Sequence, residues 1–394
     1  MMSVMTTTAI LVFLLLNILI PYPTILLPIK IHIIVAQKHF VGNLIKVSVT
    51  LTLAVQPLYL YFIIILCYNL LIIERIRIMS VNKITVVVPV YNVGNYISGA
   101  VSSLAGQSNR DFDLILVDDG STDLSIKIAL RLLDEYGLEY LLIRQNNLGQ
   151  GAARNAGFFA CKTEWILFLD SDDALQLYAI DKLYRIINDE KNKDVEAVFS
   201  DYQAIRDNDV QKPSFDYEDI YVMPRREIVR SFLVRDKNYL VPGTLYRKDF
   251  LLKYGITHKA LRWSEDLLFQ FEVMDKIQNG LYCKSAMYNY LTRSGSIMST
   301  ADTFEMSNTY EEFKAFLNQA TDPLLKKYFL SRWVLGCLHI VSRKKDPACW
   351  ADMWIALDGK KHMSILSDFP DLKVRILAGI GSISSKLLYS VLCH

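Results

Sequence analysis

The stretch ITVVVPVYN (84–92) is a run of β-branched residues that ends in proline, tyrosine and asparagine. Such an apolar run, stopped by polar residues, is typical of a strand buried on both faces of a parallel sheet. Downstream, similar apolar runs alternate with amphipathic segments of helical period. Five strands are therefore predicted, at 84–88, 114–117, 140–143, 165–169 and 197–200.

This alternation predicts an α/β fold, with a mostly parallel sheet flanked by helices. In the first helical segment, apolar residues recur at the spacing of one helix face from Ile97 to Leu104. Asn95 is placed to cap this helix, and Ser121 is placed to cap the next one. In such sheets ligands bind at the carboxyl ends of the strands. The residues at those ends are therefore the candidates for function.

Composition divides the 394 residues into three parts, at 1–78, 79–300 and 301–394. The first part is hydrophobic, and its stretches 9–29 and 47–73 are each long enough to span a bilayer. Met79 also resembles the natural start of a soluble domain, so 1–78 is either a pair of membrane spans or a leader that is not native.

Within 79–300, residues 82–200 and 201–300 form two halves, and 205–240 has no clear period, which predicts an irregular surface region. The last part, 301–394, is predicted to be helical. Stretch 373–393 is weakly amphipathic, which is typical of a helix that covers a core and, less often, of one at a membrane surface.

Bulk composition excludes several classes of function. The formal net charge of +2 argues against a nucleic-acid-binding protein, which would carry a basic domain or stripe. The six cysteines form no CxxC pair, so zinc ribbons and redox dithiols are not indicated. No disulfide framework is apparent either, which favours a reducing setting for the polar part.

The segment FLDSDDAL (168–175) places an Asp-x-Asp pair, Asp170 and Asp172, directly after an apolar run. Carboxylate oxygens are hard ligands that suit Mg²⁺ or Mn²⁺, and Mg²⁺ commonly adds substrate phosphates to one or two protein carboxylates. The pattern therefore fits a metal–diphosphate site. A solvated turn is the alternative, because aspartate is also an ordinary turn residue.

Two further segments follow strands. In ILVDDGSTD (115–123), one of the two aspartates Asp118 and Asp119 could accept a hydrogen bond from a nucleobase, and the other could steady the loop or a ribose. NNLGQGAARNAG (146–157) begins like a dinucleotide fingerprint, but its third glycine position holds Arg154. An arginine there suits a contact to a nucleotide or diphosphate better.

Together, VVVPVYN, VDDGSTD, NLGQGAARNAG and FLDSDD resemble, in order and spacing, the nucleotide-sugar-binding half of family-2 glycosyltransferases with the GT-A fold. The resemblance covers roughly residues 82–300, of which 201–300 would be the acceptor half. It implies that Asp172 binds a divalent Mg²⁺ or Mn²⁺ ion directly, together with Asp170. It also implies a nucleotide-sugar-binding set of Pro89, Val90, Tyr91, Asn92, Asp118, Asp119, Arg154, Asp170, Ser171 and Arg293.

The segment WSEDLLFQFEV (263–273) resembles the part of the family that supplies the catalytic base. The resemblance implies that Asp266 is this base, with Glu265 as its neighbour or substitute. In the alternative interpretation Ser264 caps a helix and the two acids complement the helix dipole, and both roles are compatible.

The resemblance implies inverting transfer of a sugar from a nucleoside diphosphate, with UDP favoured, to a glycan or lipid-linked acceptor in surface polysaccharide synthesis. The expected location is the cytoplasmic face of a membrane, or the cytoplasm if 1–78 is absent. Two alternatives stay open. A haloacid-dehalogenase-type phosphatase would also place Asp-x-Asp after a strand, although Ala174 stands where that motif needs threonine or valine. A membrane-anchored, non-catalytic scaffold that binds nucleotide sugars is the other.

Overall fold

The computed structural model describes residues 28–38, 44–54, 83–206, 220–261, 264–292 and 303–393. The chain forms two compact units, residues 1–79 and 80–394. In the first unit, strands β1 (Pro28–Lys38) and β2 (Leu44–Ala54) pair antiparallel.

The two stretches predicted to span a bilayer lie largely outside the described residues, and the described part of the second one, 47–54, belongs to strand β2. Within the described ranges, no helix has both the length and the apolar character that crossing a membrane requires.

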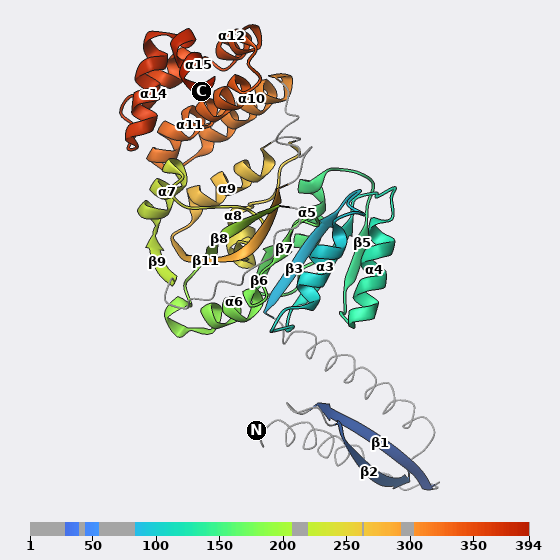
Figure 1. The fold of residues 1–394 in the computed structure, drawn as a ribbon. Coiled ribbons are helices and arrows are strands. Elements are labelled where there is room, and N and C mark those ends of the chain that lie inside the picture. The colour runs from blue at the N-terminus through green and yellow to red at the C-terminus, as the bar shows by residue number, and fades with distance from the viewer. Residues whose placement is uncertain are drawn as a thin grey trace. The chain divides into compact units, whose positions relative to one another are not determined.

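The described part of the second unit holds one mixed sheet of nine strands, in the order β5-β4-β3-β6-β10-β8-β11-β7, with β9 paired to β11 (Figure 1). Strands β3 to β6 run parallel, as predicted, while β7, β9 and β10 pair antiparallel with their neighbours. The strands are β3 (Ile84–Val90), β4 (Asp113–Asp118), β5 (Leu141–Arg144), β6 (Trp165–Phe168), β7 (Ala174–Leu175), β8 (Ala197–Arg206), β9 (Ile220–Pro224), β10 (Leu245–Arg247) and β11 (Asn279–Thr292).

Helices cover both faces of this sheet. Apolar side chains of α3, α4 and α6 pack on one face, and those of α5, α7, α8 and α9 on the other. The core that contains α5, α7, α8 and α9 continues into the C-terminal helices α10 to α15. The prediction that this part of the chain is helical is confirmed. The helices are α3 (Ile97–Ala105), α4 (Ser125–Tyr136), α5 (Gln150–Ala160), α6 (Ala179–Asn188), α7 (Arg225–Val234), α8 (Lys248–Tyr254), α9 (Glu265–Lys276), α10 (Thr303–Gln319), α11 (Pro323–Ser342), α12 (Pro347–Ala356), α13 (Gly359–Leu366), α14 (Leu372–Ile383) and α15 (Ser385–Cys393).

Three local predictions are wrong. Residues 220–234 form β9 and α7 instead of an irregular region, because the edge strand gains its hydrogen bonds from β11, far away in sequence. Neither Asn95 nor Ser121 caps a helix: α3 begins after Tyr96 and α4 after Leu124. Near the start of α4, the Asp123 carboxylate instead accepts the backbone N–H of Ser125 at 2.9 Å.

Glycine at position 157 brings α5 close to the central strand β3. A Cβ atom there would lie 2.3 Å from Cγ1 of Val87, which is buried in the core. Gly157→Ala should therefore cost about 1–3 kcal/mol of stability, because the tightly packed helix must shift. The control is Gly99→Ala in helix α3, where the added Cβ meets nothing within 4 Å. This variant should be as stable as the unmodified chain or more stable. Urea denaturation of the two variants checks this, and equal midpoints would contradict it.

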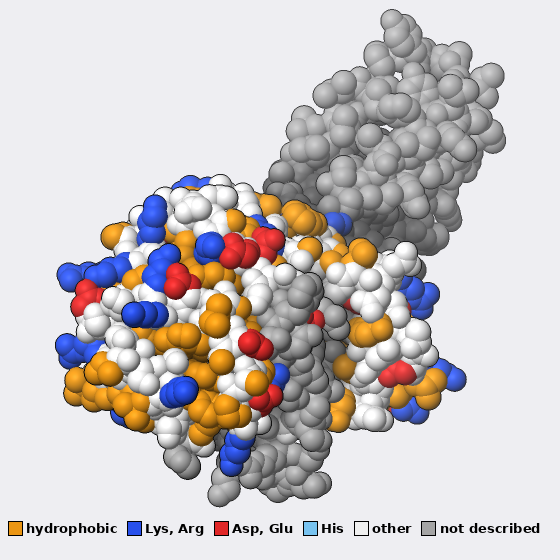
Figure 2. All heavy atoms as spheres, turned by 90° about the horizontal axis from the view of Figure 1, so that it is seen from above, with side chains coloured by type: hydrophobic (Ala, Val, Ile, Leu, Met, Phe, Trp, Pro, Cys, Tyr) orange, Lys and Arg blue, Asp and Glu red, His pale blue; other side chains and the backbone are white. Residues whose placement is uncertain are grey.

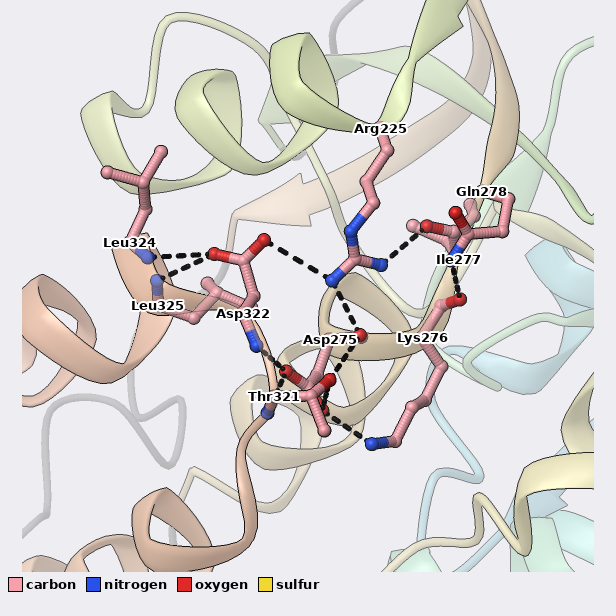
Figure 3. A network of polar contacts seen from close by, with 9 residues as sticks. All are labelled: Arg225, Asp275, Lys276, Ile277, Gln278, Thr321, Asp322, Leu324 and Leu325. Carbon is pink, nitrogen blue, oxygen red and sulfur yellow. Dashed lines mark hydrogen bonds and ion pairs between the residues drawn. The ribbon is translucent and has the colours of Figure 1, made fainter.

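Within the second unit, a network of polar contacts joins the C-terminal helices to helices α7 and α9 beside the sheet (Figure 3). At the N-terminus of α7, Arg225 donates to the carbonyl oxygens of Asp275 at 2.7 Å and Ile277 at 2.8 Å, and contacts the Asp322 carboxylate at 3.2 Å. The Asp275 carboxylate, near the end of α9, accepts the backbone N–H groups of Thr321 and Asp322, each at 2.8 Å. Asp322 in turn caps α11. Helix α9 is thus fastened at its C-terminus to the start of α11.

Candidate active site

The three polar strand ends predicted from the sequence lie at one edge of the sheet. Strands β4, β3 and β6 are neighbours and parallel, with Val90 opposite Asp118 and Val87 opposite Phe168. The segments that follow β3, β4 and β6 therefore leave the sheet side by side. This is the edge where ligands bind in open α/β sheets.

Two predicted site residues hold the loops at this edge. The Asn92 side-chain oxygen accepts backbone N–H groups of Thr122 at 2.8 Å and Asp123 at 3.3 Å, which joins the loop after β3 to the loop after β4. Asp119 is buried, and its carboxylate accepts the backbone N–H groups of Leu148 and Gly149, each at 2.9 Å. Asp119 thus steadies the start of α5, which is one of the roles predicted for the Asp118–Asp119 pair.

The other predicted nucleotide contacts differ in access. Pro89 and Val90 are buried within β3, whereas the Tyr91 side chain beyond the strand is 45% exposed. Asp118 is nearly buried, and its carboxylate accepts the backbone N–H of Ser121 at 2.9 Å. Tyr91 is therefore the side chain of this group that is most open to a ligand. Arg293 lies outside the described residues.

The centre of the site is Arg154 on α5, whose side chain is fully buried. Its Nη2 lies 2.7 Å from Oδ1 of Asp170, and its Nη1 bonds the Asp266 carboxylate and lies 3.9 Å from Oε1 of Glu265. Carboxylates from the segment after β6 and from the first turn of α9 thus meet on one guanidinium. Gly151, one turn earlier on α5, lets the helix lie close to the segment at His258, because a Cβ at position 151 would lie only 3.1 Å from the His258 Cβ. The prediction of a nucleotide contact for Arg154 does not match a side chain enclosed by three carboxylates.

Burial and mutual repulsion perturb the acids of this cluster. Burial, together with the nearby Asp266 carboxylate, raises the pKa of Glu265 to about 7. Burial also raises the pKa of Asp266, although Arg154 opposes the shift. The Asp266 side chain keeps 39% of its surface exposed, so solvent moderates this effect. Burial lowers the pKa of Arg154, but its three carboxylate neighbours outweigh this and raise it overall. Arg154 is therefore a permanent cation.

The Asp-x-Asp segment forms an acidic cluster with one additional member. Carboxylate oxygens of Asp170, Asp172 and Asp173 all lie within 4.8 Å of one another. Asp173 is buried and accepts hydrogen bonds from the Tyr288 hydroxyl and from the backbone N–H of Leu291 at 2.7 Å. Sequence reasoning did not single out Asp173 as a ligand, although it directly follows the pair. Ser171, predicted to bind the nucleotide sugar, is buried in the turn.

A cavity of about 510 Å³ opens beside this acidic cluster. Its wall includes Asp172 and Asp173, the hydroxyl groups of Ser98 and Ser102 on α3, and Leu291 at the end of β11. A space of this size, with carboxylate and serine residues in part of its wall, can hold a hydroxyl-bearing ligand next to a metal ion.

His258 is a further member of the site that sequence reasoning missed. Its ring stacks on Phe269 with a centroid distance of 4.3 Å, and its Nδ1 lies 3.8 Å from Oδ1 of Asp266. Neither ring nitrogen has a hydrogen-bond partner among the described residues. Burial, with the nearby positive charges of Arg154 and Lys259, holds the pKa of His258 well below its usual value. His258 is therefore a neutral neighbour of Asp266.

Comparison with known proteins identifies this arrangement. Residues 85–255 match the model of "Glycosyl transferase family 2". An uncharacterised glycosyltransferase of Nostoc sp. is 38% identical over 127 residues, which is 32% of this chain and 38% of the relative. Glycosyltransferase GlyG of Streptococcus pneumoniae is 27% identical over 254 residues, covering 61% of this chain and 81% of the relative.

Among solved structures, residues 1–349 of Staphylococcus aureus TarS in complex with UDP-GlcNAc superpose with a TM-score of 0.59 at 20% identity. The match covers 79% of this chain and 90% of that one. The mixed sheet, its flanking helices and the polar strand ends thus define a GT-A fold. The match of residues 85–255 to the family-2 model confirms the resemblance found in the sequence.

Proposed function

We propose that this chain is a metal-dependent, inverting glycosyltransferase that moves a sugar from a nucleoside diphosphate to a hydroxyl group of an acceptor. The observation that supports this most is the pairing of Asp170 and Asp266 with the same buried Arg154. This pairing couples the acidic segment for the donor to the helix that begins with the candidate base.

The donor set fits a hard divalent cation. Asp170, Asp172 and Asp173 offer only carboxylate oxygens, which Mg²⁺ and Mn²⁺ prefer. Asp172, with Asp170, would hold the ion, while Tyr288 and Leu291 fix Asp173 beside them. When bound, such an ion supplies Lewis-acid stabilisation of the negative charge on a leaving diphosphate.

Asp266 is proposed as the general base. Its carboxylate takes the proton of the acceptor hydroxyl while the hydroxyl oxygen forms the new bond to the anomeric carbon. The bond from that carbon to the diphosphate breaks, and its electron pair leaves with the diphosphate. Arg154 holds the carboxylate in place, and the 39% exposure of Asp266 leaves it open to an acceptor. Glu265, at the same helix start, is its neighbour and possible substitute.

The nucleotide is assigned to the ends of β3 and β4. Exposed Tyr91 would pack on the base, and Asp118 would accept a hydrogen bond from it. UDP is the favoured nucleotide because of the family resemblance, and a glycan or lipid-linked acceptor in surface polysaccharide synthesis follows from the same source. The cytoplasmic face of a membrane is the proposed location. Arg293 is proposed to reach the diphosphate.

A thermal-shift screen of UDP-, GDP- and dTDP-sugars with and without Mn²⁺ tests this function. A saturating donor should raise the melting temperature by roughly 5–10 °C, and only with the metal present. Asp172→Ala should abolish this metal-dependent shift, while Asp134→Ala, an exposed acid on α4, should keep it.

A turnover assay then distinguishes a catalytic transferase from a non-catalytic scaffold. Release of free nucleoside diphosphate from the donor that gave the shift supports the proposal. A shift without any release, unchanged by Asp172→Ala, would favour the non-catalytic scaffold instead.

A further inference from the structure

Helix α14 exposes apolar side chains where a surface helix normally exposes polar ones. Leu372 is 62% exposed, Ile376 55% and Ile383 85%. Their spacing of i, i+4 and i+11 places them along one narrow stripe of a helix with 3.6 residues per turn. Helix α15 follows after Ser384, whose backbone is extended, and its Leu387 and Val391 are 51% and 44% exposed.

The opposite face of α14 already has its partners. Val374, Ala378 and Gly381 are buried in the core of the C-terminal helices. A Cβ at Gly381 would lie 2.7 Å from Met363 and 2.8 Å from Leu388, so this face is packed tightly. The exposed stripe is therefore not needed to hold α14 in the fold. Apolar groups that gather on a surface commonly mark a site of interaction.

Basic residues flank the stripe, and the acid that precedes it, Asp371, caps the N-terminus of α14 by accepting the backbone N–H of Val374 at 2.9 Å. Exposed Lys373 and Arg375 lie on opposite sides of the stripe, at about +100° and −60° from Leu372 around the helix. Exposed Lys386 follows on α15, and residues 372–393 contain no aspartate or glutamate. Figure 2, the view from above, shows hydrophobic side chains on this side of the molecule with Lys and Arg side chains between them.

We propose that the exposed stripe of α14, with its flanking basic residues, binds the surface of an anionic lipid membrane. An apolar stripe between cations suits the boundary between acyl chains and anionic headgroups. A second copy of the chain fits less well. A symmetric contact between two such stripes would bring the cations of both copies together. This inference rests on α14 and α15 alone and does not depend on the proposed transferase activity.

The polar contacts of Asp275 connect the proposed membrane-binding surface with the candidate active site. Helix α9 begins with Glu265 and Asp266, and its end lies beside Asp322, which caps α11. Helix α11 packs with α13 and α15, and both of these pack with α14. A membrane bound to α14 would therefore be held at a fixed orientation to the candidate base. Such an arrangement would suit an acceptor that is anchored in the same lipid.

Local hydrogen exchange in the full chain tests the surface without interference from residues 1–79. With phosphatidylglycerol–phosphatidylcholine vesicles, amides of 372–393 should exchange several-fold more slowly than with phosphatidylcholine vesicles or without lipid. The double variant Ile376→Gln and Ile383→Gln should lose this protection, since it removes two apolar anchors without disturbing the buried face. Lys373→Gln with Arg375→Gln should lose most of the preference for the anionic lipid.

Leu252→Gln is the matched control, because Leu252 is 48% exposed on α8, outside the stripe, and this variant should behave as the unmodified chain. The proposal is overturned if 372–393 is equally protected with and without vesicles. Protection that grows with protein concentration in the absence of lipid would overturn it as well, and would identify a second copy as the partner.

Discussion

Asp266→Asn is expected to lower kcat by about 10²–10⁴-fold while leaving donor binding intact. Asparagine keeps the size of the side chain and its bond to Arg154, but it cannot take the proton of the acceptor hydroxyl. In the proposed function the donor binds at the ends of β3, β4 and β6 and not through Asp266, so the metal-dependent thermal shift should persist. The measurement is kcat for release of the nucleoside diphosphate, alongside the thermal shift.

Glu265→Gln is the matched control for this prediction. Glu265 precedes Asp266 in the same first turn of α9 but is less exposed, at 15% against 39% for the side chains. A base must reach the acceptor, so loss of the less accessible carboxylate should lower kcat much less. A larger effect of Glu265→Gln than of Asp266→Asn would assign the base to Glu265 instead.

The pKa of Asp266, the proposed base, also determines how kcat/KM depends on pH. Burial raises the pKa of Asp266 above the ordinary aspartate value. Since the base acts when ionised, kcat/KM of the unmodified chain should fall on the acid side at a pH above that ordinary value. In Asp266→Asn this acid limb should vanish from the residual activity.

The strand ends could be predicted from the sequence because each signal is local. A β-branched run followed by polar residues, as at Val90–Asn92, needs no distant partner to be recognised. Parallel neighbours then bring these ends to one edge, and the observed pairing of β3 with β4 and β6 confirms it. Asp170 and Asp266 were both placed in the site on sequence patterns, and the structure joins them through one side chain.

The role of Arg154 could not be predicted in the same way. Its local context, after two glycines at the start of a helix, indicated a contact to a nucleotide. Its actual partners come from positions 170, 265 and 266, and nothing in the local pattern shows that the first turn of α9 meets this side chain of α5. The buried ring of His258 was missed for the same reason, because its neighbours Phe269 and Asp266 meet it only in the fold.

Arg154→Met is expected to destabilise the protein by about 3–5 kcal/mol at pH 7. Methionine fills a similar volume, so the loss comes mainly from the charge. The carboxylates of Asp170 and Glu265, 17% and 15% exposed, then lack the cation that compensates their burial. Chemical denaturation measures this loss. Arg131→Met on α4 is the control, because its pair with Glu135 is exposed at 66% and 55% and should contribute less than about 1 kcal/mol.

The pH dependence of this loss distinguishes charge from packing. Without Arg154, the pKa values of Glu265 and Asp266 in the folded state rise further above their unfolded values, so the native state binds more protons than the unfolded chain. Its stability therefore increases as the pH falls from 7 toward 5, where these groups become neutral. The gap between Arg154→Met and the unmodified chain should shrink over this range. A gap that stays constant or widens toward pH 5 would mean that Arg154 stabilises the fold through packing and not through its three carboxylate partners.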